Sequence, residues 1–575
     1  MRINDFKGEV PARDVRLLPA NYARSAVNVD LDKGTIRPLS DLLDQDPAAW
    51  MFVNEAGVDV VPANISGVNR LLVSGLTGYP EARQGITTRR WGVVAPATIP
   101  AVSVAGTPAA GAGVVDSPSY RYSFVTAWGE ESALSDATMP VDVREGEHIA
   151  LSNFSVPTLV DSGNEIVYIR VYRLASTETG STAYQWVPMR TAVDGASAYD
   201  VSTNDITGIS TQLYDVNSAQ DALNSNLSDV AITAGWDPPP DGAAGGVEYT
   251  NGVYALFKNK TVYLSVGGYY YAFPASGVLD YTFETQYAIV GLGTYNHQLI
   301  VCTEAFPDVI SGIDPASASR SSLNYHFPCL AKKSILSLPY GVFYFSGDGG
   351  VIVDGSSARL VTGHLFTRTQ WQAYPLSDAI CGYWRGKIFV FFSGQTYGFV
   401  LDLDLSYVIR FSDIGQAVTD VFVDPINDQL YLNSANGWFC WDAGTGTLSA
   451  TYQTAIVQGP PATYSAGRVS GNFPQHEIFE VAKIENDLEF DHTTLTVLSG
   501  NLFQVLRDNR IVVDLCVWGD GKKAYEQTAL ASAEAFRLRG LHRAREWYMD
   551  VDLAGSAEIY ALLLARNMEE LRRNG

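Results

Sequence analysis

The chain has 575 residues, which is too long for one hydrophobic core, so we expect three or four domains. Its 31 Tyr, 24 Phe and 51 Gly, together with the scarcity of helical periods, favour β structure. Asp and Glu number 62 against 39 Lys and Arg, and this net charge of −23 excludes a protein that grips the DNA backbone through a positive face.

Residues 1–95 predict an N-terminal β arm that supplies strands to a propeller or to a platform. Within it, residues 22–39 indicate two strands that turn at Lys33 and Gly34, and Pro38 ends the second strand. The first residues lack the apolar segment of a signal peptide, so we expect no secretion signal. No window of the chain approaches 18 consecutive apolar residues, and we expect no membrane span.

Residues 96–114 are rich in Pro, Ala and Gly and carry no charge, which predicts an extended linker. The next segment, residues 115–235, contains several short strands of alternating pattern. Tyr120, Tyr122 and Phe124 fall on one face of such a strand. Short strands over roughly 100 residues are typical of an immunoglobulin-like or fibronectin-like β-sandwich, and we predict this fold for the segment.

Residues 236–455 repeat one pattern: a hydrophobic strand, a turn of Gly, Asn or Asp, and a second alternating strand. Five copies recur, spaced about 42 residues apart on average. They are GVYALFKNKTVYLS, YAIVGLGTYNHQLIVCT, GVFYFSGDGGVIVDG, ICGYWRGKIFVFFSGQTYGFVLDLD and VFVDPINDQLYLNSANGWFCWD. A strand repeat of this length predicts the blades of a β-propeller, because one small sheet cannot bury both of its faces alone.

A large β-sandwich and a β-helix are the alternatives for this region. Regular spacing disfavours a sandwich, and the repeat is longer than that of a β-helix. We therefore predict an all-β protein, in which a propeller carries an inserted sandwich and a C-terminal β-rich platform module. Residues 456–575 form that platform in our prediction, with Trp547, Met549 and Val551 on one face of a strand and a helical turn at the end of the chain.

The residues that could carry chemistry are scattered. Five isolated cysteines lie in apolar segments, which predicts buried reduced thiols: Cys302, Cys329, Cys381, Cys440 and Cys516. Seven histidines show no metal-ligand spacing: His148, His297, His326, His364, His476, His492 and His542. The chain has no nucleophile elbow, phosphate-binding loop or dinucleotide fingerprint. We predict no enzyme activity, no cofactor and no metal site.

Two acidic motifs resemble sites only superficially. The sequence SGDGGVIVDG lacks the alternating oxygens and closing Glu of an EF-hand, so Asp348 and Asp354 are expected to shape turns. Asp402 and Asp404 are expected on the same side of a strand, where they could form a carboxylate pair for glycoside chemistry. A strand edge that faces solvent or a pore is the interpretation that we favour for this pair.

Four arginines cluster near the C-terminus at Arg537, Arg539, Arg543 and Arg545. In a chain this acidic, such a patch would not overcome the overall field at a nucleic acid. We predict that the four arginines form a salt-bridged contact with another subunit or an adaptor.

Several phrases taken together resemble a known family. They are residues 3–39 (INDFKGEV to TIRPL), 122–135 (YSFVTAWGEESALS), 235–265 (GWDPPPDG to KNKTVYLS), 289–315 (IVGLGTYNHQ to SGIDP) and 340–362 (YGVFYFSGDGG to ARLVT). In this order, they resemble the tail nozzle proteins, or tail tubular proteins B, of short-tailed bacteriophages. The similarity extends in order along the whole chain, although the residues after GGYYYAFP keep little of the aromatic-rich sequence that is usual in the family.

The resemblance implies a propeller-bearing virion protein without an active site. It implies assembly in the host cytoplasm into a ring, commonly six-fold, below the portal and the adaptor ring. Such a ring continues the channel for double-stranded DNA without binding it specifically, gates genome ejection, carries tail fibres or spikes, and meets the host envelope during infection. Neither the resemblance nor the residues identify which positions line that channel.

The acidic balance agrees with such a conduit, because negatively charged walls repel packaged DNA. Screening limits this repulsion to about 8 Å at physiological salt. Acidity that merely keeps a large β protein soluble is the alternative.

Two other functions stay open at this point. The first is a carbohydrate-binding propeller for host attachment, in which aromatic residues of GGYYYAF and CGYWRG stack on sugars. The second is a glycoside hydrolase on a propeller scaffold, which needs two carboxylates about 5–10 Å apart in a central pocket.

Overall fold

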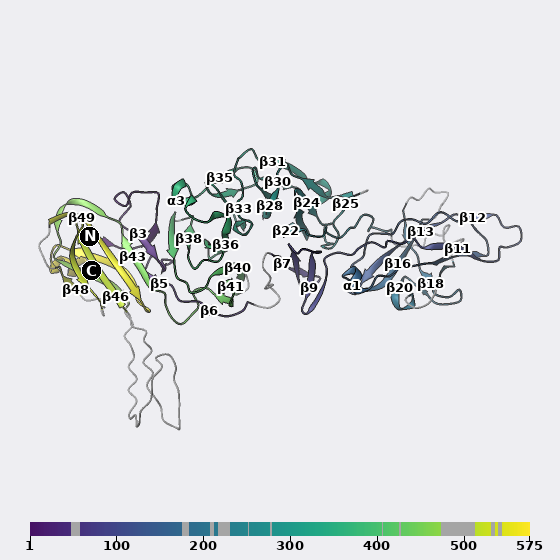
Figure 1. The fold of residues 1–575 in the computed structure, drawn as a ribbon, viewed down its shortest axis with the longest axis horizontal. Coiled ribbons are helices and arrows are strands. Elements are labelled where there is room, and N and C mark those ends of the chain that lie inside the picture. Colours follow the sequence, from purple (N-terminus) through teal and green to yellow (C-terminus); the bar gives the residue numbers. More distant parts are fainter. Residues whose placement is uncertain are drawn as a thin grey trace, which may run out of the picture.

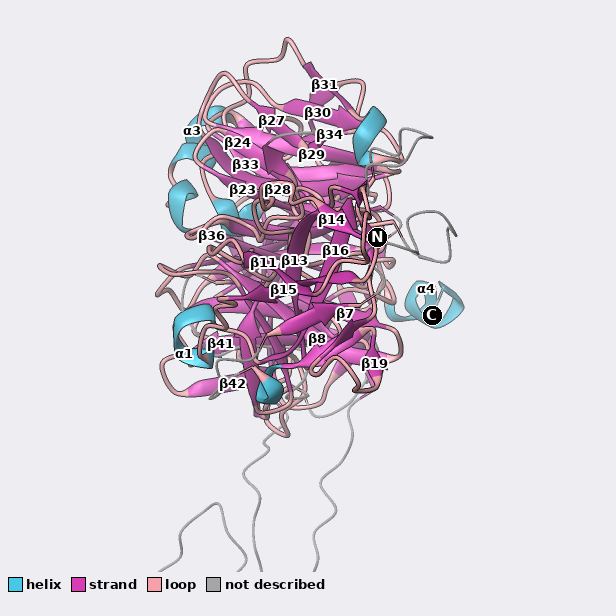
Figure 2. Ribbon diagram, turned by 90° about the vertical axis from the view of Figure 1, so that its right-hand side faces the viewer, coloured by secondary structure: helices cyan, strands magenta, loops and turns pink. Residues whose placement is uncertain are grey.

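The computed structural model describes residues 1–47, 58–174, 183–206, 212–216, 230–250, 252–276, 279–404, 406–424, 427–472, 512–528, 530, 535–538 and 543–574. These residues form an all-β protein, which confirms the predicted class. Figure 2 shows that the helices are short and lie at the margins of the strands. They include α1 (Leu159–Ser162), α3 (Arg368–Gln372) and α4 (Met568–Asn574). Among the described residues, no helix has the length and apolar character that crossing a membrane requires.

Six four-stranded antiparallel meanders form the middle of the molecule, and we call them together the array. Sheet 1 is β7 (Asp59–Ile65), β8 (Val68–Ser74), β9 (Glu81–Gln84) and β10 (Thr87–Arg90). Sheet 2 is β22 (Ala244–Thr250), β23 (Val253–Lys258), β24 (Thr261–Leu264) and β27 (Thr282–Glu284). Sheet 3 is β28 (Ile289–Tyr295), β29 (Gln298–Thr303), β30 (Asp308–Ser311) and β31 (Ser319–Ser322).

Sheets 4 to 6 continue the same order. Sheet 4 is β32 (Leu336–Leu338), β33 (Gly341–Ser346), β34 (Gly349–Val353) and β35 (Ala358–Leu360). Sheet 5 is β36 (Ala379–Trp384), β37 (Lys387–Phe392), β38 (Gly398–Asp402) and β39 (Tyr407–Phe411). Sheet 6 is β40 (Val418–Asp424), β41 (Gln429–Ser434), β42 (Gly437–Cys440) and, from the N-terminal arm, β6 (Leu43–Asp44). The arm therefore completes sheet 6 and contributes all of sheet 1.

The sequence pattern explains why these meanders form. Strands such as β33 and β37 bury nearly every residue because they lie between neighbouring sheets. The hairpin turns use residues that tolerate a positive φ, including Asn259 at 56°, Asn296 at 46° and Asp428 at 50°. Asp428 lies in the turn of the fifth repeat copy, where the repeat pattern predicts Gly, Asn or Asp.

Residues 96–235, which we call the insert, leave the array after β10 and return before β22. One sheet has the order β11 (Ala101–Gly106), β15 (Glu147–Ser152), β21 (Leu213–Asp215), β18 (Met189–Arg190) and β19 (Ser197–Ala198). A second sheet contains β13 (Ser119–Thr126), β16 (Ile166–Leu174), β17 (Gln185–Trp186) and β20 (Asp200–Ser202). The strands β12 (Val114–Asp116) and β14 (Val143–Arg144) form a separate pair.

The core of the insert contains the face predicted from alternation, since Tyr120, Tyr122 and Phe124 are all buried. The linker predicted for residues 96–114 is corrected by the pairing of β11, which lies antiparallel to β15 over all six of its residues. The low charge and the Pro and Ala content suggested a linker, but Ala101–Gly106 still alternates and finds a partner strand that is distant in sequence.

The platform lies at the other end of the molecule. One of its sheets has the order β1 (Arg2–Ile3), β50 (Glu558–Ala565), β45 (Ala466–Asn472) and β48 (Ala535–Arg537). The strands β43 (Ala450–Thr454), β44 (Val457–Thr463), β46 (Val512–Gly519), β47 (Lys522–Gln527) and β49 (Arg543–Ala554) belong to a larger sheet. In β49, Trp547, Met549 and Val551 are buried, as their alternation predicted.

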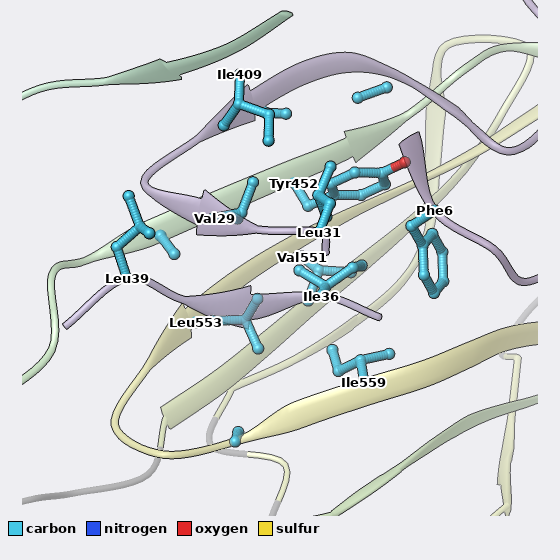
Figure 3. Close-up of a cluster of buried hydrophobic side chains, with 14 of the residues drawn as sticks. Phe6, Val29, Leu31, Ile36, Leu39, Ile409, Tyr452, Val551, Leu553 and Ile559 are labelled. Carbon is cyan, nitrogen blue, oxygen red and sulfur yellow. The ribbon is translucent and has the colours of Figure 1, made fainter. Parts of the chain in front are cut away.

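The N-terminal arm joins the platform to the array. Strand β2 (Lys7–Glu9) pairs with β39 of sheet 5, and β3 (Tyr22–Val27) pairs with β43, so one continuous sheet runs from sheet 5 into the platform. Figure 3 shows the shared core, in which Phe6 of the arm, Ile409 of sheet 5 and Val551 of the platform lie in one cluster. The rings of Phe6 and Tyr452 meet edge to face at 5.3 Å. This core holds the arm, the array and the platform together.

Figure 1 shows an elongated molecule with the three parts in a row. The platform, which contains both chain termini, lies at one end, the array lies in the middle and the insert lies at the other end.

Candidate functional site

The six sheets of the array surround a cavity of about 600 Å³. It is lined by residues of the first strand of every sheet and by the segment before β32, including Asp59, Gly246, Gly291, Lys332, Leu336, Ile380 and Val421. Neighbouring first strands are in contact from β7 through β22, β28, β32 and β36 to β40. The cavity is therefore the place where side chains from distant parts of the chain converge.

Two adjacent lysines reach across this cavity from a short 3-10 turn, Lys332–Ser334, which precedes β32 of sheet 4. Lys332 Nζ lies 2.5 Å from Asp59 Oδ2 of sheet 1, and the same carboxylate oxygen accepts a 2.6 Å hydrogen bond from the backbone N–H of Gly245. Lys333 Nζ lies 2.9 Å from Asp420 Oδ2 of sheet 6. The two pairs tie sheet 4 to the first and last sheets of the array.

The ion pairs decide what the cavity can do. Each lysine faces a carboxylate, so neither is a free cation for a phosphate or a carboxylate ligand. Among the residues that the structure describes, no group of three or more His, Cys, Asp or Glu is placed to hold a metal ion. The arrangement supports a structural role, in which buried or half-buried charges hold the array together.

A second polar cluster joins the insert to the array. Arg70 of β8 donates a 2.6 Å hydrogen bond to the Tyr270 hydroxyl, which also contacts Glu130 of the insert. The guanidinium of Arg70 lies 4.4 Å from the centre of the Trp128 ring. Glu130 is only 2 % exposed, and this burial raises the pKa of its carboxyl. The cluster fixes the insert against sheets 1 and 2.

A third cluster holds the N-terminal arm on sheet 5. Glu9 of β2 is buried and accepts hydrogen bonds from the backbone N–H of Ala26 at 2.6 Å and from Arg410 Nε at 3.0 Å. Burial raises the pKa of Glu9, and the charge of Arg410 opposes this shift. Lys332, Glu130 and Glu9 were all missed by sequence reasoning. For Lys332 a signal existed, because Lys332 and Lys333 form an adjacent pair inside an apolar stretch.

The predicted arginine patch lies on the platform. Arg537 ends β48, whereas Arg543 and Arg545 lie at the start of β49, which belongs to a different sheet. All three are exposed, and within the described part of the chain none of them forms an ion pair. Arg539 falls outside the described residues. The subunit or adaptor contact therefore stays a prediction.

The acidic motifs take up structural positions. Asp402 is the last residue of β38, is buried, and lies 3.9 Å from Lys387. Asp404 lies in the following turn and is exposed, so the expectation that the two carboxylates share one side of a strand is wrong. The chain turns at Leu403 before the alternation can continue. Asp354 accepts hydrogen bonds from Ser356 and Ser357, as expected for a turn residue, and these bonds lower its pKa.

The aromatic motifs considered for sugar stacking are mostly buried. Tyr270 and Trp384 are 4 % and 8 % exposed, and Tyr269, at 36 %, packs against Trp236 with 4.4 Å between ring centres. Four of the five cysteines are buried, as predicted, and Cys516 is half-buried. The described histidines, His148, His297, His326 and His364, lie in different parts of the fold, and the other three fall outside the described residues.

The comparisons with known proteins assign no family. No protein-family model matches the chain, and no curated protein is significantly similar to it. Among solved structures, the extracellular domain of a one-component system of B. thetaiotaomicron matches with 9 % identity and a TM-score of 0.24, over 96 % of this chain and 82 % of that one. The extracellular domain of a hybrid two-component system of the same organism gives 10 % identity and 0.25, over 98 % and 76 %. Apo AztD from Citrobacter koseri gives 12 % identity and 0.21, over 52 % and 95 %.

Proposed function

We propose that this chain is a structural virion protein that forms the distal tail tube, or nozzle, of a short-tailed phage. In this proposal the array is a six-bladed β-propeller, and copies of the chain stand side by side in a ring that continues the DNA channel. The observation that carries the proposal is the extended row of platform, array and insert (Figure 1), a form that suits a wall element repeated around a conduit.

The path of DNA follows from the cavity inside the array. Its volume of about 600 Å³ is that of a small-molecule pocket, and the pairs Lys332–Asp59 and Lys333–Asp420 cross it. A DNA duplex cannot pass through such a space. The conduit therefore runs between copies of the chain, and the array is a solid part of its wall.

The charge is distributed unevenly along the molecule. The insert carries 5 Lys and Arg against 16 Asp and Glu, a net charge of −11, whereas residues 1–95 carry 11 of each sign. Its arginines are partly used internally, since Arg170 pairs with Glu131 and Asp200, and Arg173 pairs with Asp215. Several copies of the insert would give one end of a ring a strongly negative rim, which repels DNA within about one Debye length, roughly 8 Å.

The platform is the end that suits attachment to the rest of the tail. It carries the exposed arginines Arg537, Arg543 and Arg545 and lies at the opposite end from the insert (Figure 1). In the proposal this end meets the adaptor ring or a neighbouring subunit through charge complementarity. The insert end points away from the particle, towards the host envelope.

Labelled particles test the proposal. We expect antibodies against the full chain to decorate the tails of purified particles in negative-stain images, and light scattering of the purified chain to give the mass of a closed oligomer, alone or with its adaptor. The double variant Arg543→Glu and Arg545→Glu should reduce incorporation into tails at least ten-fold. The matched control Arg368→Glu changes an arginine that is 71 % exposed on the array and should leave incorporation unchanged. Tails without label would overturn the proposal.

A further inference from the structure

One strand of the insert, β11, has an edge along which the described residues place no partner strand. Strand β11 is the first strand of its sheet, pairs with β15 on one side, and has no described strand on the other. Alternate residues of an antiparallel edge strand direct their backbone N–H and C=O groups away from the sheet, where they can pair with another strand. Ser103 and Val104, in the middle of β11, are both exposed.

The usual protection of an edge is missing from β11. Native edge strands carry a charge, a proline or a bulge that prevents pairing with another chain. The six residues AVSVAG contain no charge and no proline, and their register with β15 is uninterrupted. Pro100 and Pro108 flank the strand without entering it. Near it in the chain, Ile99, Val114 and Val115 are 46 %, 52 % and 42 % exposed.

The second sheet of the insert has a covered edge at β13. The outer edge of β13 is covered by residues 130–141, whose backbone N–H groups at Ser132, Ser135 and Thr138 donate to carbonyl groups of that strand. The hydroxyls of the same three residues accept the backbone N–H groups of Phe124, Tyr122 and Tyr120. The insert therefore satisfies one sheet edge within its own chain, whereas the described residues place no strand on the outer edge of β11.

The opposite edge of the β11 sheet is open as well. Strand β19 is the last strand in the order and pairs only with β18 among the described residues. Residues 196–199 around it, Ala-Ser-Ala-Tyr, are exposed and uncharged. The four successive pairings from β11 to β19 are all antiparallel, so the two edge strands run in the same direction.

We propose that β11 of one copy pairs in parallel with β19 of the next copy, so that the insert sheets of neighbouring subunits join head to tail. The occupant is a second copy of this chain because two uncharged edges let inserts of net charge −11 approach without direct repulsion. An interface made from two different edges is heterologous, and such an interface generates a ring when the rotation between successive copies closes. The contact deepens the proposed function and rests on it for the ring. The β11–β19 contact is short. It fixes the register and the relative direction of neighbouring copies within a larger interface.

Cross-linking tests the pairing in the full-length chain. Cys516 is the one thiol that is not buried, so all variants carry Cys516→Ser, which prevents the cross-linker from reacting with that native thiol. In that background we compare Ser103→Cys, Ser197→Cys and the double variant, each treated with a short bismaleimide and analysed on a denaturing gel. We expect dimers and higher multimers from the double variant alone. Dimers from Ser103→Cys alone would mean that β11 pairs with itself and would overturn the proposal.

A second measurement separates this inference from the proposed function. Light scattering of the unmodified chain reports whether a closed oligomer forms at all. A closed oligomer without cross-links in the double variant overturns the strand pairing and leaves the proposed function standing, whereas a chain that stays monomeric, even with its adaptor, overturns both. Val104→Lys places a charge on the open edge and should raise the concentration for half-assembly at least ten-fold. The control Ile86→Lys changes a fully exposed apolar residue in the turn between β9 and β10 and should leave that concentration unchanged.

Discussion

Lys332 and Asp59 are 273 positions apart in the sequence, yet their side chains form a 2.5 Å ion pair inside the array. Asp59 begins the first sheet, and Lys332 comes from the turn before the fourth sheet. Both residues line the cavity of the array, and their sheets are three places apart in the order of the six sheets. The pair therefore links two sheets that are not neighbours, which contacts between adjacent sheets cannot do.

Removing the lysine of this pair should destabilise the array. Lys332→Met leaves the half-buried Asp59 carboxylate with the hydrogen bond from the Gly245 N–H but without its cation, and we expect the free energy of unfolding to fall by about 1–2 kcal/mol. Urea unfolding followed by tryptophan fluorescence measures this change. The control Arg368→Met breaks an exposed pair with Asp348 and should cost less than about 0.5 kcal/mol. Equal losses of unfolding free energy in the two variants would contradict a stabilising Lys332–Asp59 ion pair across the cavity.

The joint between the insert and the array should weaken as the pH rises. Burial raises the pKa of Glu130 above its ordinary value of 4.5, so the folded state holds this proton more tightly than the unfolded chain. The resulting stabilisation is complete below pH 4.5 and is lost as the pH rises through the folded pKa. In thermal melts between pH 4.5 and 8, Glu130→Gln should gain stability relative to the unmodified chain as the pH increases.

A second variant sharpens that test. The Tyr270 hydroxyl contacts Glu130 and favours its charged form, so Tyr270→Phe should raise the pKa of Glu130 further and extend the loss of stability to higher pH. Parallel melting curves for Glu130→Gln and the unmodified chain would show that this carboxyl does not govern the joint.

The N-terminal arm should be held less tightly on sheet 5 when Glu9 loses Arg410 as a partner. Arg410→Ala leaves a carboxylate that is 4 % exposed without its guanidinium, and we expect a loss of about 2–3 kcal/mol in urea unfolding. The double variant Glu9→Gln with Arg410→Ala removes the stranded charge and should recover at least half of that loss. Additive losses in the double-mutant cycle would exclude a direct interaction between the two side chains.

Gly8 should tolerate no side chain. A Cβ at this position would lie 2.3 Å from the carbonyl oxygen of Val408 and 2.7 Å from the Tyr407 ring, because β2 passes close to β39. We expect Gly8→Ala to cost about 3 kcal/mol in thermal unfolding, through displacement of the arm. Gly78→Ala is the control, since nothing lies within 4 Å of its Cβ, and it should change stability by less than about 0.5 kcal/mol. A neutral Gly8→Ala would mean that the arm is not packed on β39.

Alternation along the chain was enough to predict individual strands and their buried faces. Tyr120, Tyr122 and Phe124 in the insert, and Trp547, Met549 and Val551 in the platform, are buried as their period of two requires. The same reasoning failed where partners are distant. It assigned Ala101–Gly106 to a linker although that segment pairs with β15, and it kept Asp404 in a strand that ends at Asp402.

Composition and local pattern by themselves determined the all-β class, the repeated meanders and the excess of negative charge, because side-chain alternation, turn residues and formal charge are properties of short segments. Only the tertiary structure decided that β6 completes sheet 6, that Lys332 meets Asp59, that Glu9 meets Arg410, and that β11 has no described strand on its outer side. The first three depend on backbone or charged groups that are hundreds of residues apart, and the fourth depends on which strands join the β11 sheet. Local pattern does not encode which of many compatible partners the folded chain brings within hydrogen-bonding distance.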